Sequence, residues 1–280
     1  MAYDTILLRY GEIFLKGKNK GTFEQKLIEN IREMVYRETK VVPKVQKSQG
    51  RMLVPYFSGH RVLQRVFGLT SYSPAVRVEK ITEAIQHKAV ELLRGKTGTF
   101  RISTKRSDKS FPVPSPEFNR LIGEQVEEYT KLRFSSAAPE ITLVIEINQE
   151  GAYLFFESIA CAGGLPAGVE GKVLLLVEGE ASLLAGLLFL KRGCSIVPVA
   201  FAEKDISVLQ EFSPVELKLQ LVKDAAELDS LAKSENISIL VTGQTLQDQA
   251  HKTDLIVMKP LVAYSKKQIK EQLEWFRSLI

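Results

Sequence analysis

The stretch KVLLLVEGEASLLAGLLFLKRGCSIVPVA, residues Lys172–Ala200, decides how the C-terminal part of the chain folds. A continuous apolar run predicts a buried strand over Lys172–Val177. Leucine-rich sequence then predicts a helix over Ala181–Leu190, and a second apolar run predicts a strand over Ser195–Ala200. A strand, a helix and another strand in this order form a unit whose two strands are parallel. The C-terminal part is therefore predicted to be an α/β layer with a parallel sheet.

Weaker signals continue the same alternation after this stretch. Short apolar runs and one amphipathic segment predict three more strands and a last helix, over Leu217–Val222, Ser238–Thr242, Leu255–Met258 and Lys266–Leu279. Upstream, AGGLPAGVEG at Ala162–Gly171 holds five glycines or prolines. Glycine and proline interrupt regular structure, so this segment is predicted to be a linker.

The first part of the chain is predicted to be a small α+β sandwich. The pattern predicts a strand, a glycine- and lysine-rich loop, a helix with Thr22 as N-cap, two strands and a short helix, over Asp4–Tyr10, Gly11–Gly21, Thr22–Thr39, Val41–Gln46, Arg51–Phe57 and His60–Phe67. The long helix is expected to bury the apolar residues that recur at three- and four-residue spacing, which are Leu27, Ile28, Ile31, Met34 and Val35. A βαββα pattern of this size is typical of a ferredoxin-like fold.

A second α+β part follows between this sandwich and the linker. Its predicted elements are a strand, a helix, a strand, a basic loop, a helix and two hairpin strands, over Ala75–Val78, Thr82–Leu93, Thr99–Thr104, Lys105–Pro116, Pro116–Arg133, Ile141–Asn148 and Ala152–Glu157. The hairpin is expected to turn at Gln149–Gly151. We therefore expect three domains, over residues 1–70, 71–165 and 166–280.

Composition excludes several classes of protein. The chain has 280 residues, of which 45% are hydrophobic and 25% charged, as in ordinary globular domains. No apolar run is long enough to cross a membrane, and the N-terminus lacks the features of a secretory leader, so a cytoplasmic location is expected. The cysteines Cys161 and Cys194 and the histidines His60, His87 and His251 are scattered, so the spacing predicts neither a metal site nor a catalytic constellation.

The basic residues are concentrated at the start of the chain. Residues 1–110 hold 22 Lys+Arg against 10 Asp+Glu, whereas residues 166–280 hold 13 against 15. A localised positive surplus is the electrostatic footprint of a protein that binds a polyanion. A solvated basic surface without a partner is the alternative explanation.

Four spaced motifs resemble the tRNA 4-thiouridine synthase (ThiI) family. They are LLRYGEIFLKGKNKG at Leu7–Gly21, RVFGLTSYSP at Arg65–Pro74, KRSDKSFPVPSPEFNRLIG at Lys105–Gly123 and GGLPAG at Gly163–Gly168. The resemblance implies an N-terminal ferredoxin-like domain, a THUMP domain that binds the acceptor end of tRNA, and a C-terminal Rossmann-like PP-loop ATP pyrophosphatase domain. It also implies a homodimer through the last domain.

Basic residues within two of these motifs are predicted to contact RNA. The candidates are Lys16, Lys18, Lys20, Lys105, Arg106, Lys109 and Arg120. Flexible ammonium groups and guanidinium groups near a helix N-terminus suit phosphate oxygens. Phe111 is a weaker candidate for stacking on an unpaired base, because an aromatic residue there more often packs in a core.

The nucleotide loop of the family is altered in this chain. In active members the strand at Lys172–Val177 is followed by a Ser-Gly-Gly-x-Asp-Ser loop that binds ATP phosphates, whereas this chain has VEGEASLLAG at Val177–Gly186. Glu178, Gly179 and Ser182 form the remnant, and no aspartate follows. Carboxylates in a phosphate cradle repel a triphosphate, so we expect no bound ATP and no cofactor.

Later family segments are altered as well. Gln244 stands where the family has glutamate, and Lys259 stands at an arginine position. The family sequence continues beyond the point corresponding to Ile280 and includes a sulfur-carrying cysteine for which no counterpart is found. The C-terminal domain is therefore expected to be degenerate and truncated, with no catalytic residue of its own.

Three functions remain open on the sequence. The preferred hypothesis is a tRNA-binding THUMP protein without its own ATP-dependent sulfurtransferase activity. The alternative is a tRNA sulfurtransferase component, with a possible link to thiamine biosynthesis, that obtains ATP chemistry or a cysteine from a separate partner. A third is an interaction module whose basic face binds another polyanion.

Overall fold

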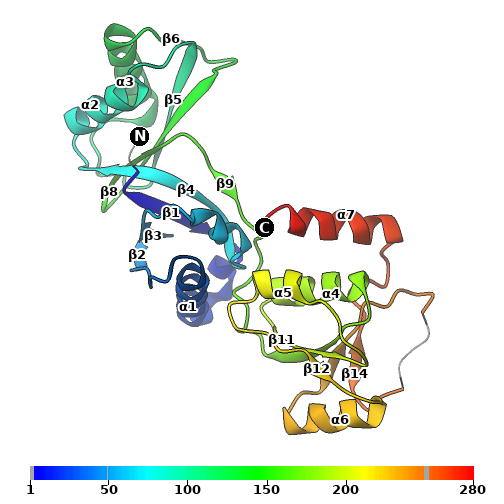
Figure 1. The fold of residues 1–280 in the computed structure, drawn as a ribbon. Coiled ribbons are helices and arrows are strands. Elements are labelled where there is room, and N and C mark those ends of the chain that lie inside the picture. The colour runs from blue at the N-terminus through cyan, green and yellow to red at the C-terminus, as the bar shows by residue number, and fades with distance from the viewer. Residues whose placement is uncertain (1–2, 49, 249–251) are drawn as a thin grey trace. The chain divides into compact units, whose positions relative to one another are not determined.

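The structure is a computed structural model that describes residues 3–48, 50–248 and 252–280. The chain divides into two compact units, and each is described by itself (Figure 1). Unit 1 comprises Met1–Arg9, Lys44–Ser58 and Ser71–Ile159, and unit 2 comprises Tyr10–Pro43, Gly59–Thr70 and Ala160–Ile280. Within the described residues no helix is long and apolar enough to cross a membrane.

One mixed sheet forms the basis of unit 1. Among the described residues it has nine strands, in the order β2-β3-β1-β4-β8-β7-β5-β6, with β9 paired to β4. In that order the strands are Gln46–Ser48, Arg51–Pro55, Thr5–Tyr10, Leu69–Val78, Gly151–Phe155, Ile141–Asn148, Thr99–Arg106 and Arg133–Phe134, and β9 is Ile159–Ala160. The predicted hairpin is present, because β7 and β8 pair antiparallel with Asn148 opposite Gly151.

Two helices pack against the β5 side of this sheet. They are α2 (Thr82–Leu93) and α3 (Ser115–Tyr129), which contact each other, and α3 also contacts β5. Their apolar faces meet the sheet in one core that includes Ile85, Phe100 and Phe118, each with no exposed surface. This core supplies the rigid support for the loop between β5 and α3.

The sheet of unit 1 curls strongly. Arg51 on β3 contacts Glu146 on β7 at 3.3 Å, although three strands separate β3 from β7 in the sheet order. Four strand spacings in a flat sheet amount to about 19 Å, which two side chains cannot span. The inner face of the curl holds a buried cluster of Leu7, Leu53, Ala75, Tyr153 and Phe155.

A parallel sheet forms the basis of the C-terminal part of unit 2. Its order is β12-β11-β10-β13-β14, with bounds Gln220–Leu221, Ser195–Ala200, Lys172–Leu176, Ile239–Val241 and Ile256–Met258. Figure 1 shows α4 (Glu180–Lys191) and α5 (Ser207–Phe212) on one face and α6 (Ala225–Ser234) on the other. The last helix, α7 (Lys266–Arg277), contacts α4. Helices on both faces of a parallel sheet confirm the predicted Rossmann-like layer.

Unit 2 also contains helices from the start of the chain. These are the 3₁₀ helix η1 (Glu12–Asn19), α1 (Lys20–Thr39) and the 3₁₀ helix η2 (His60–Arg65). The Asn30 side chain of α1 donates a hydrogen bond to the carbonyl of Ala167 in the linker, at 3.0 Å. All five apolar residues predicted to form the buried face of α1 are buried. The linker therefore has specific contacts with α1.

Several predicted elements are placed differently by the structure. The strand predicted at Val41–Gln46 is wrong, because Val41 is exposed and the strand begins only at Gln46, opposite Leu53 of β3. The predicted loop Gly11–Gly21 is largely the 3₁₀ helix η1. Gly17, with φ 51°, allows a turn before α1, which begins at Lys20 and not at Thr22.

Two helices were not predicted, α5 and α6. Both are short, and α6 buries only Leu228 and Ala232, so its apolar periodicity is weak. The sequence signal that was available for α6 is the capping pair at its N-terminus, Asp224 and Glu227. The Asp224 carboxylate accepts from the backbone N–H of Glu227 at 2.9 Å, and the Glu227 carboxylate accepts from the N–H of Lys223 at 2.7 Å.

Candidate functional site

A cavity of about 1060 Å³ lies at the carboxyl ends of the parallel strands of unit 2. Its walls come from the β10–α4 loop, the segment after β13 and the segment before α7. The strand order reverses between β10 and β13, and ligands of α/β proteins bind at such a reversal. The lining residues are Glu178, Gly179, Ala181, Ser182, Gly243, Gln244, Thr245, Leu246, Gln247, Asp248, Val262, Ala263, Tyr264, Ser265, Lys266 and Ile269.

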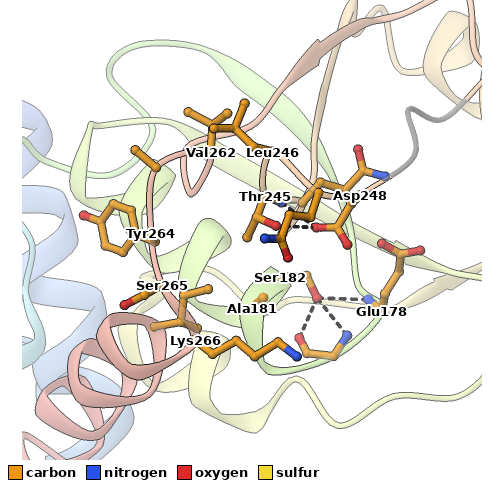
Figure 2. A pocket seen from close by; sticks show the side chains of 16 residues that line it. Glu178, Ala181, Ser182, Thr245, Leu246, Asp248, Val262, Tyr264, Ser265 and Lys266 are labelled. Atoms are coloured by element: carbon orange, nitrogen blue, oxygen red, sulfur yellow. Dashed lines mark hydrogen bonds between the residues drawn. The ribbon is translucent and has the colours of Figure 1, made fainter.

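Ser182 organises the β10–α4 loop. Its buried hydroxyl accepts hydrogen bonds from the backbone N–H groups of Glu178 and Gly179, at 2.9 and 3.0 Å, and donates to the Gly179 carbonyl at 2.6 Å (Figure 2). The three remnant residues named from the sequence are therefore brought together. Both of these loop amides therefore already have a hydrogen-bond partner.

The segment after β13 lies directly against the start of α4. A Cβ atom built on Gly243 would lie 2.6 Å from the carbonyl carbon of Ala181 and 2.8 Å from Cα of Ser182. Only glycine permits two backbones to approach this closely. The first turn of α4 is consequently covered by protein backbone on that side.

The charged groups of the cavity are mostly acidic. Among its described lining residues Lys266 is the one lysine or arginine, whereas Glu178 and Asp248 contribute carboxylates. The Asp248 carboxylate accepts from the Thr245 N–H at 2.6 Å and from the Thr245 hydroxyl at 2.9 Å, and these hydrogen bonds lower the pKa of Asp248. Asp248 is therefore ionised at neutral pH.

The N-terminus of α7 is closed by its own side chains. The Gln268 side-chain oxygen accepts from the Ser265 N–H at 2.9 Å, and the Ser265 hydroxyl accepts from the Gln268 N–H at 3.3 Å. This reciprocal pair is a capping box, which satisfies helix-end amides internally. At each of the two helices that begin at the cavity, two backbone amides therefore already have a side-chain partner.

Neither a cysteine nor a histidine is among the described residues that line the cavity. Cys161 is buried, with 8% of its surface exposed. Cys194 is half-buried, and burial raises the pKa of its thiol. His87 is exposed on α2, and His251 lies outside the described residues. Within the described residues no group of three His, Cys, Asp or Glu is placed to hold a metal ion.

The lysines of the first motif are partly engaged in ion pairs. The Lys16 ammonium group lies 2.8 Å from the Glu170 carboxylate and 4.6 Å from the centre of the Phe23 ring. Lys20 lies 3.5 Å from Glu24 one helical turn away. Lys18 is exposed on η1. Lys16 therefore forms an ion pair with the linker. Lys18 is the exposed lysine of this group, so its ammonium group is accessible to a phosphate of bound RNA.

The basic residues of the β5–α3 region have different roles. Lys105 and Arg106 were predicted in the loop, but β5 continues through them because β7 extends alongside, with Lys105 opposite Glu146. The Arg106 guanidinium donates to the carbonyls of Phe111 and Val113, at 2.6 and 3.0 Å, and so fixes the loop. Lys105 and Lys109 are exposed.

Two further residues of this region that were candidates for RNA contact interact with other side chains of the protein. Arg120 is exposed on α3 and pairs with Glu124 at 2.6 Å, a contact that water and salt weaken easily. Phe111 is only 2% exposed and packs edge-on against Phe118, with ring centres 5.1 Å apart. Stacking of Phe111 on a base is therefore excluded in this arrangement, and the packing role is confirmed.

Sequence reasoning missed Arg51. It lines a second cavity, of about 220 Å³, together with Lys105, Arg106, Ser107, Glu146, Ile147 and Asn148. The Glu146 carboxylate, nearly buried, lies 2.8 Å from the Arg9 guanidinium and 3.3 Å from that of Arg51. Nothing in the sequence signals this cluster, because the curl of the sheet brings together residues 95 positions apart.

Comparisons with known proteins agree with this architecture. The ThiI ferredoxin-like domain model matches residues 5–73, and the THUMP domain model matches residues 75–157. A probable tRNA sulfurtransferase from Brevibacillus brevis is 39% identical over 211 residues, which are 72% of this chain and 52% of that protein. A probable tRNA sulfurtransferase from Streptococcus pneumoniae is 39% identical over 210 residues, with the same coverages. The chain thus spans about half the length of these curated relatives.

Two solved structures resemble nearly the whole chain. A crystal structure of a protein from Pyrococcus horikoshii has a TM-score of 0.85 and 29% identity, and covers 98% of this chain and 99% of that one. A 4-thiouridine synthetase in complex with RNA and with bound ATP has a TM-score of 0.80 and 25% identity, and covers 99% of this chain and 86% of that one.

These features define a THUMP-domain protein that carries a ferredoxin-like domain of the ThiI type and a Rossmann-like parallel layer. Within that class the chain is related to the tRNA sulfurtransferases of the ThiI family. The resemblance noted in the sequence is confirmed.

Proposed function

We propose that this protein binds tRNA near the acceptor end through its THUMP domain and does not itself use ATP to transfer sulfur. Exposed Lys105 and Lys109 beside the β5–α3 loop support RNA binding, as does the similarity to a 4-thiouridine synthetase solved with RNA. The observation that carries the second half of the proposal is the Ser182 hydroxyl, which already satisfies the amides of Glu178 and Gly179.

Two free-energy costs oppose the binding of a triphosphate in this cavity. A phosphate oxygen that replaced Ser182 at these amides would leave the buried hydroxyl with only its bond to the Gly179 carbonyl, at a cost of about 0.5–1.5 kcal/mol for each hydrogen bond lost. Each carboxylate close to a phosphate adds a repulsion between about 1 kcal/mol in water and about 4 kcal/mol at an effective dielectric constant near 20. Glu178 and Asp248 both line the cavity, with Lys266 as the one lysine or arginine among its described lining residues.

The test measures ATP use and tRNA binding separately. We expect no release of AMP and pyrophosphate from ATP by the purified chain, with or without tRNA. Full-length tRNA should bind more tightly than the same tRNA without its single-stranded 3′ end, over a range of salt concentrations. Cleavage of ATP that tRNA stimulates would refute the catalytic half of the proposal, and equal weak binding of both RNAs would refute the tRNA half.

A second candidate is a sulfur-transfer component that works with a separate polypeptide. The 39% identity to probable tRNA sulfurtransferases favours it. In that case deletion of the gene should remove 4-thiouridine from cellular tRNA, as measured by mass spectrometry of tRNA digests. Unchanged 4-thiouridine would leave only the binding function.

A further inference from the structure

The small cavity of unit 1 is built from one face of the curled sheet. Lys105 of β5 lies beside Glu146 of β7 in register, and Ser107 and Asn148 follow each of them two positions later. Residues two apart on a strand share a face, so these four side chains line one wall. Arg51 of β3 reaches the same place from the opposite side of the curl, because it contacts Glu146.

The cations of this cavity keep donors available. Within the described residues the exposed Lys105 ammonium group makes no ion pair. The Arg51 guanidinium uses Nε on Glu146, at 3.3 Å, and Nη1 on the carbonyl of Gly50, at 2.8 Å, which leaves Nη2 for another acceptor. An ammonium group and a fixed guanidinium edge together match a phosphate group, which accepts several hydrogen bonds.

The buried carboxylate does not cancel this charge. Glu146 is shared by the guanidinium groups of Arg9 and Arg51, so the cluster of these three residues with Lys105 has a surplus of positive charge. Glu146 positions Arg51 and does not act as a ligand, because both of its oxygens are engaged by arginine. A cavity of about 220 Å³ holds one phosphate group, and it is too small for a whole nucleotide together with its water.

The geometry points to a single phosphate site at Lys105 and Arg51, in which a backbone phosphate of bound RNA would be held. This inference rests on the proposed tRNA-binding function and deepens it. It adds a residue from the region matched by the ferredoxin-like model to the RNA contacts predicted in the THUMP region. Arg51 and Lys105 would thereby fix the register of the RNA without reading its sequence.

The experiment uses the full chain and a synthetic acceptor-stem hairpin RNA with its single-stranded 3′ end. Phosphates are replaced one at a time by uncharged methylphosphonate, and each RNA is titrated by fluorescence anisotropy against the native protein and Lys105→Ala. Lys131→Ala is the matched control, because it removes the same charge from an exposed position outside the cavity.

We expect one phosphate position, or two adjacent ones, whose replacement weakens binding to the native protein by about tenfold, the size of one charge-assisted contact. The same replacement should have little further effect on Lys105→Ala, and it should keep its full effect on Lys131→Ala. The salt slope of Lys105→Ala should fall by about 0.7–0.9. Identical position profiles in the native protein and Lys105→Ala would overturn the inference.

A second arm separates an RNA phosphate from free phosphate. Inorganic phosphate is titrated into the isotope-labelled protein, and the amide NMR signals of Lys105 and Ser107 are followed. Shifts in these signals without any coupled position in the RNA series would assign the site to free phosphate and overturn the RNA assignment. Failure of the hairpin to bind at all would refute the proposed function itself, whereas binding without coupling refutes this inference alone.

Discussion

At the scale of single residues, Asp108 holds the loop between β5 and α3. Its carboxylate accepts from the Ser110 N–H at 2.8 Å and from the Ser110 hydroxyl at 2.7 Å, and it also pairs with Lys80. The hydrogen bond from Lys80, followed by those from Ser110, lowers the pKa of Asp108 from 3.8 to about 2. The loop that presents Lys109 therefore depends on an ionised carboxylate.

The lowered pKa of Asp108 fixes the direction of a pH effect. The stabilisation is fully present above the pKa of the unfolded chain, near 3.8, and is lost as the pH falls toward the folded value of about 2. Asp108→Asn should therefore be less stable than the native protein at pH 7, and the difference should shrink between pH 4 and pH 2. Denaturant titrations at several pH values measure this.

A matched variant controls for the loss of charge alone. Glu128→Gln removes a carboxylate from an exposed position of α3, outside this hydrogen-bond network, and should change stability little at any pH. A difference between Asp108→Asn and the native protein that stays constant down to pH 2 would contradict the assigned role.

At the scale of elements, two glycines within helices should respond oppositely to alanine. A Cβ on Gly186 of α4 would lie 2.5 Å from Leu175 and 2.9 Å from Leu209, and both leucines are fully buried, so they cannot yield. Gly186→Ala should cost about 1–3 kcal/mol in the free energy of unfolding. Gly123 of α3 has no atom within 4 Å of such a Cβ, so Gly123→Ala should stabilise by about 0.5–1 kcal/mol. Denaturant unfolding of both variants measures these changes. Equal changes in the free energy of unfolding of the two variants would contradict the prediction.

The sequence predicted elements whose signal is local. The strand and helix over β10 and α4 have long apolar runs, and β11 was predicted with the bounds Ser195–Ala200 that the structure has. The strand β2 was misplaced because its position is decided by pairing with Met52 and Leu53 on another strand, not by its own exposed residues. The contact of Arg51 with Glu146 was out of reach for the same reason.

In the candidate sites too, what is local in the sequence was predictable and what depends on the fold was not. Glu178, Gly179 and Ser182 are adjacent in the sequence, so their proximity was predictable, whereas the hydrogen bonds of Ser182 to the loop amides were not. The fold class and the family resemblance are confirmed. The domain boundaries, the RNA contacts, the homodimer and the cytoplasmic location stay predictions.

At the scale of the whole molecule, unit 2 joins segments from both ends of the sequence. Phe67, which follows η2, is 2% exposed, and its ring centre lies 5.6 Å from that of Phe212 and 6.2 Å from that of Phe276. The guanidinium of Arg65, the last residue of η2, also pairs with Glu211 of α5. The segment that follows η2 therefore shares a core with the C-terminal layer, and α1 contacts η2.

This shared core predicts that α1 and the parallel sheet lose protection together. Phe67→Ala should lower the free energy of unfolding by about 3–5 kcal/mol, the cost of removing a buried phenyl ring. Hydrogen exchange of this variant should accelerate in both α1 and β10, because one compact unit contains both and such units often open cooperatively. Phe111→Ala, which removes a buried ring from unit 1, should accelerate exchange in α3 and leave β10 unchanged. Faster exchange confined to residues 59–70 in Phe67→Ala would show that the two ends of the sequence fold independently.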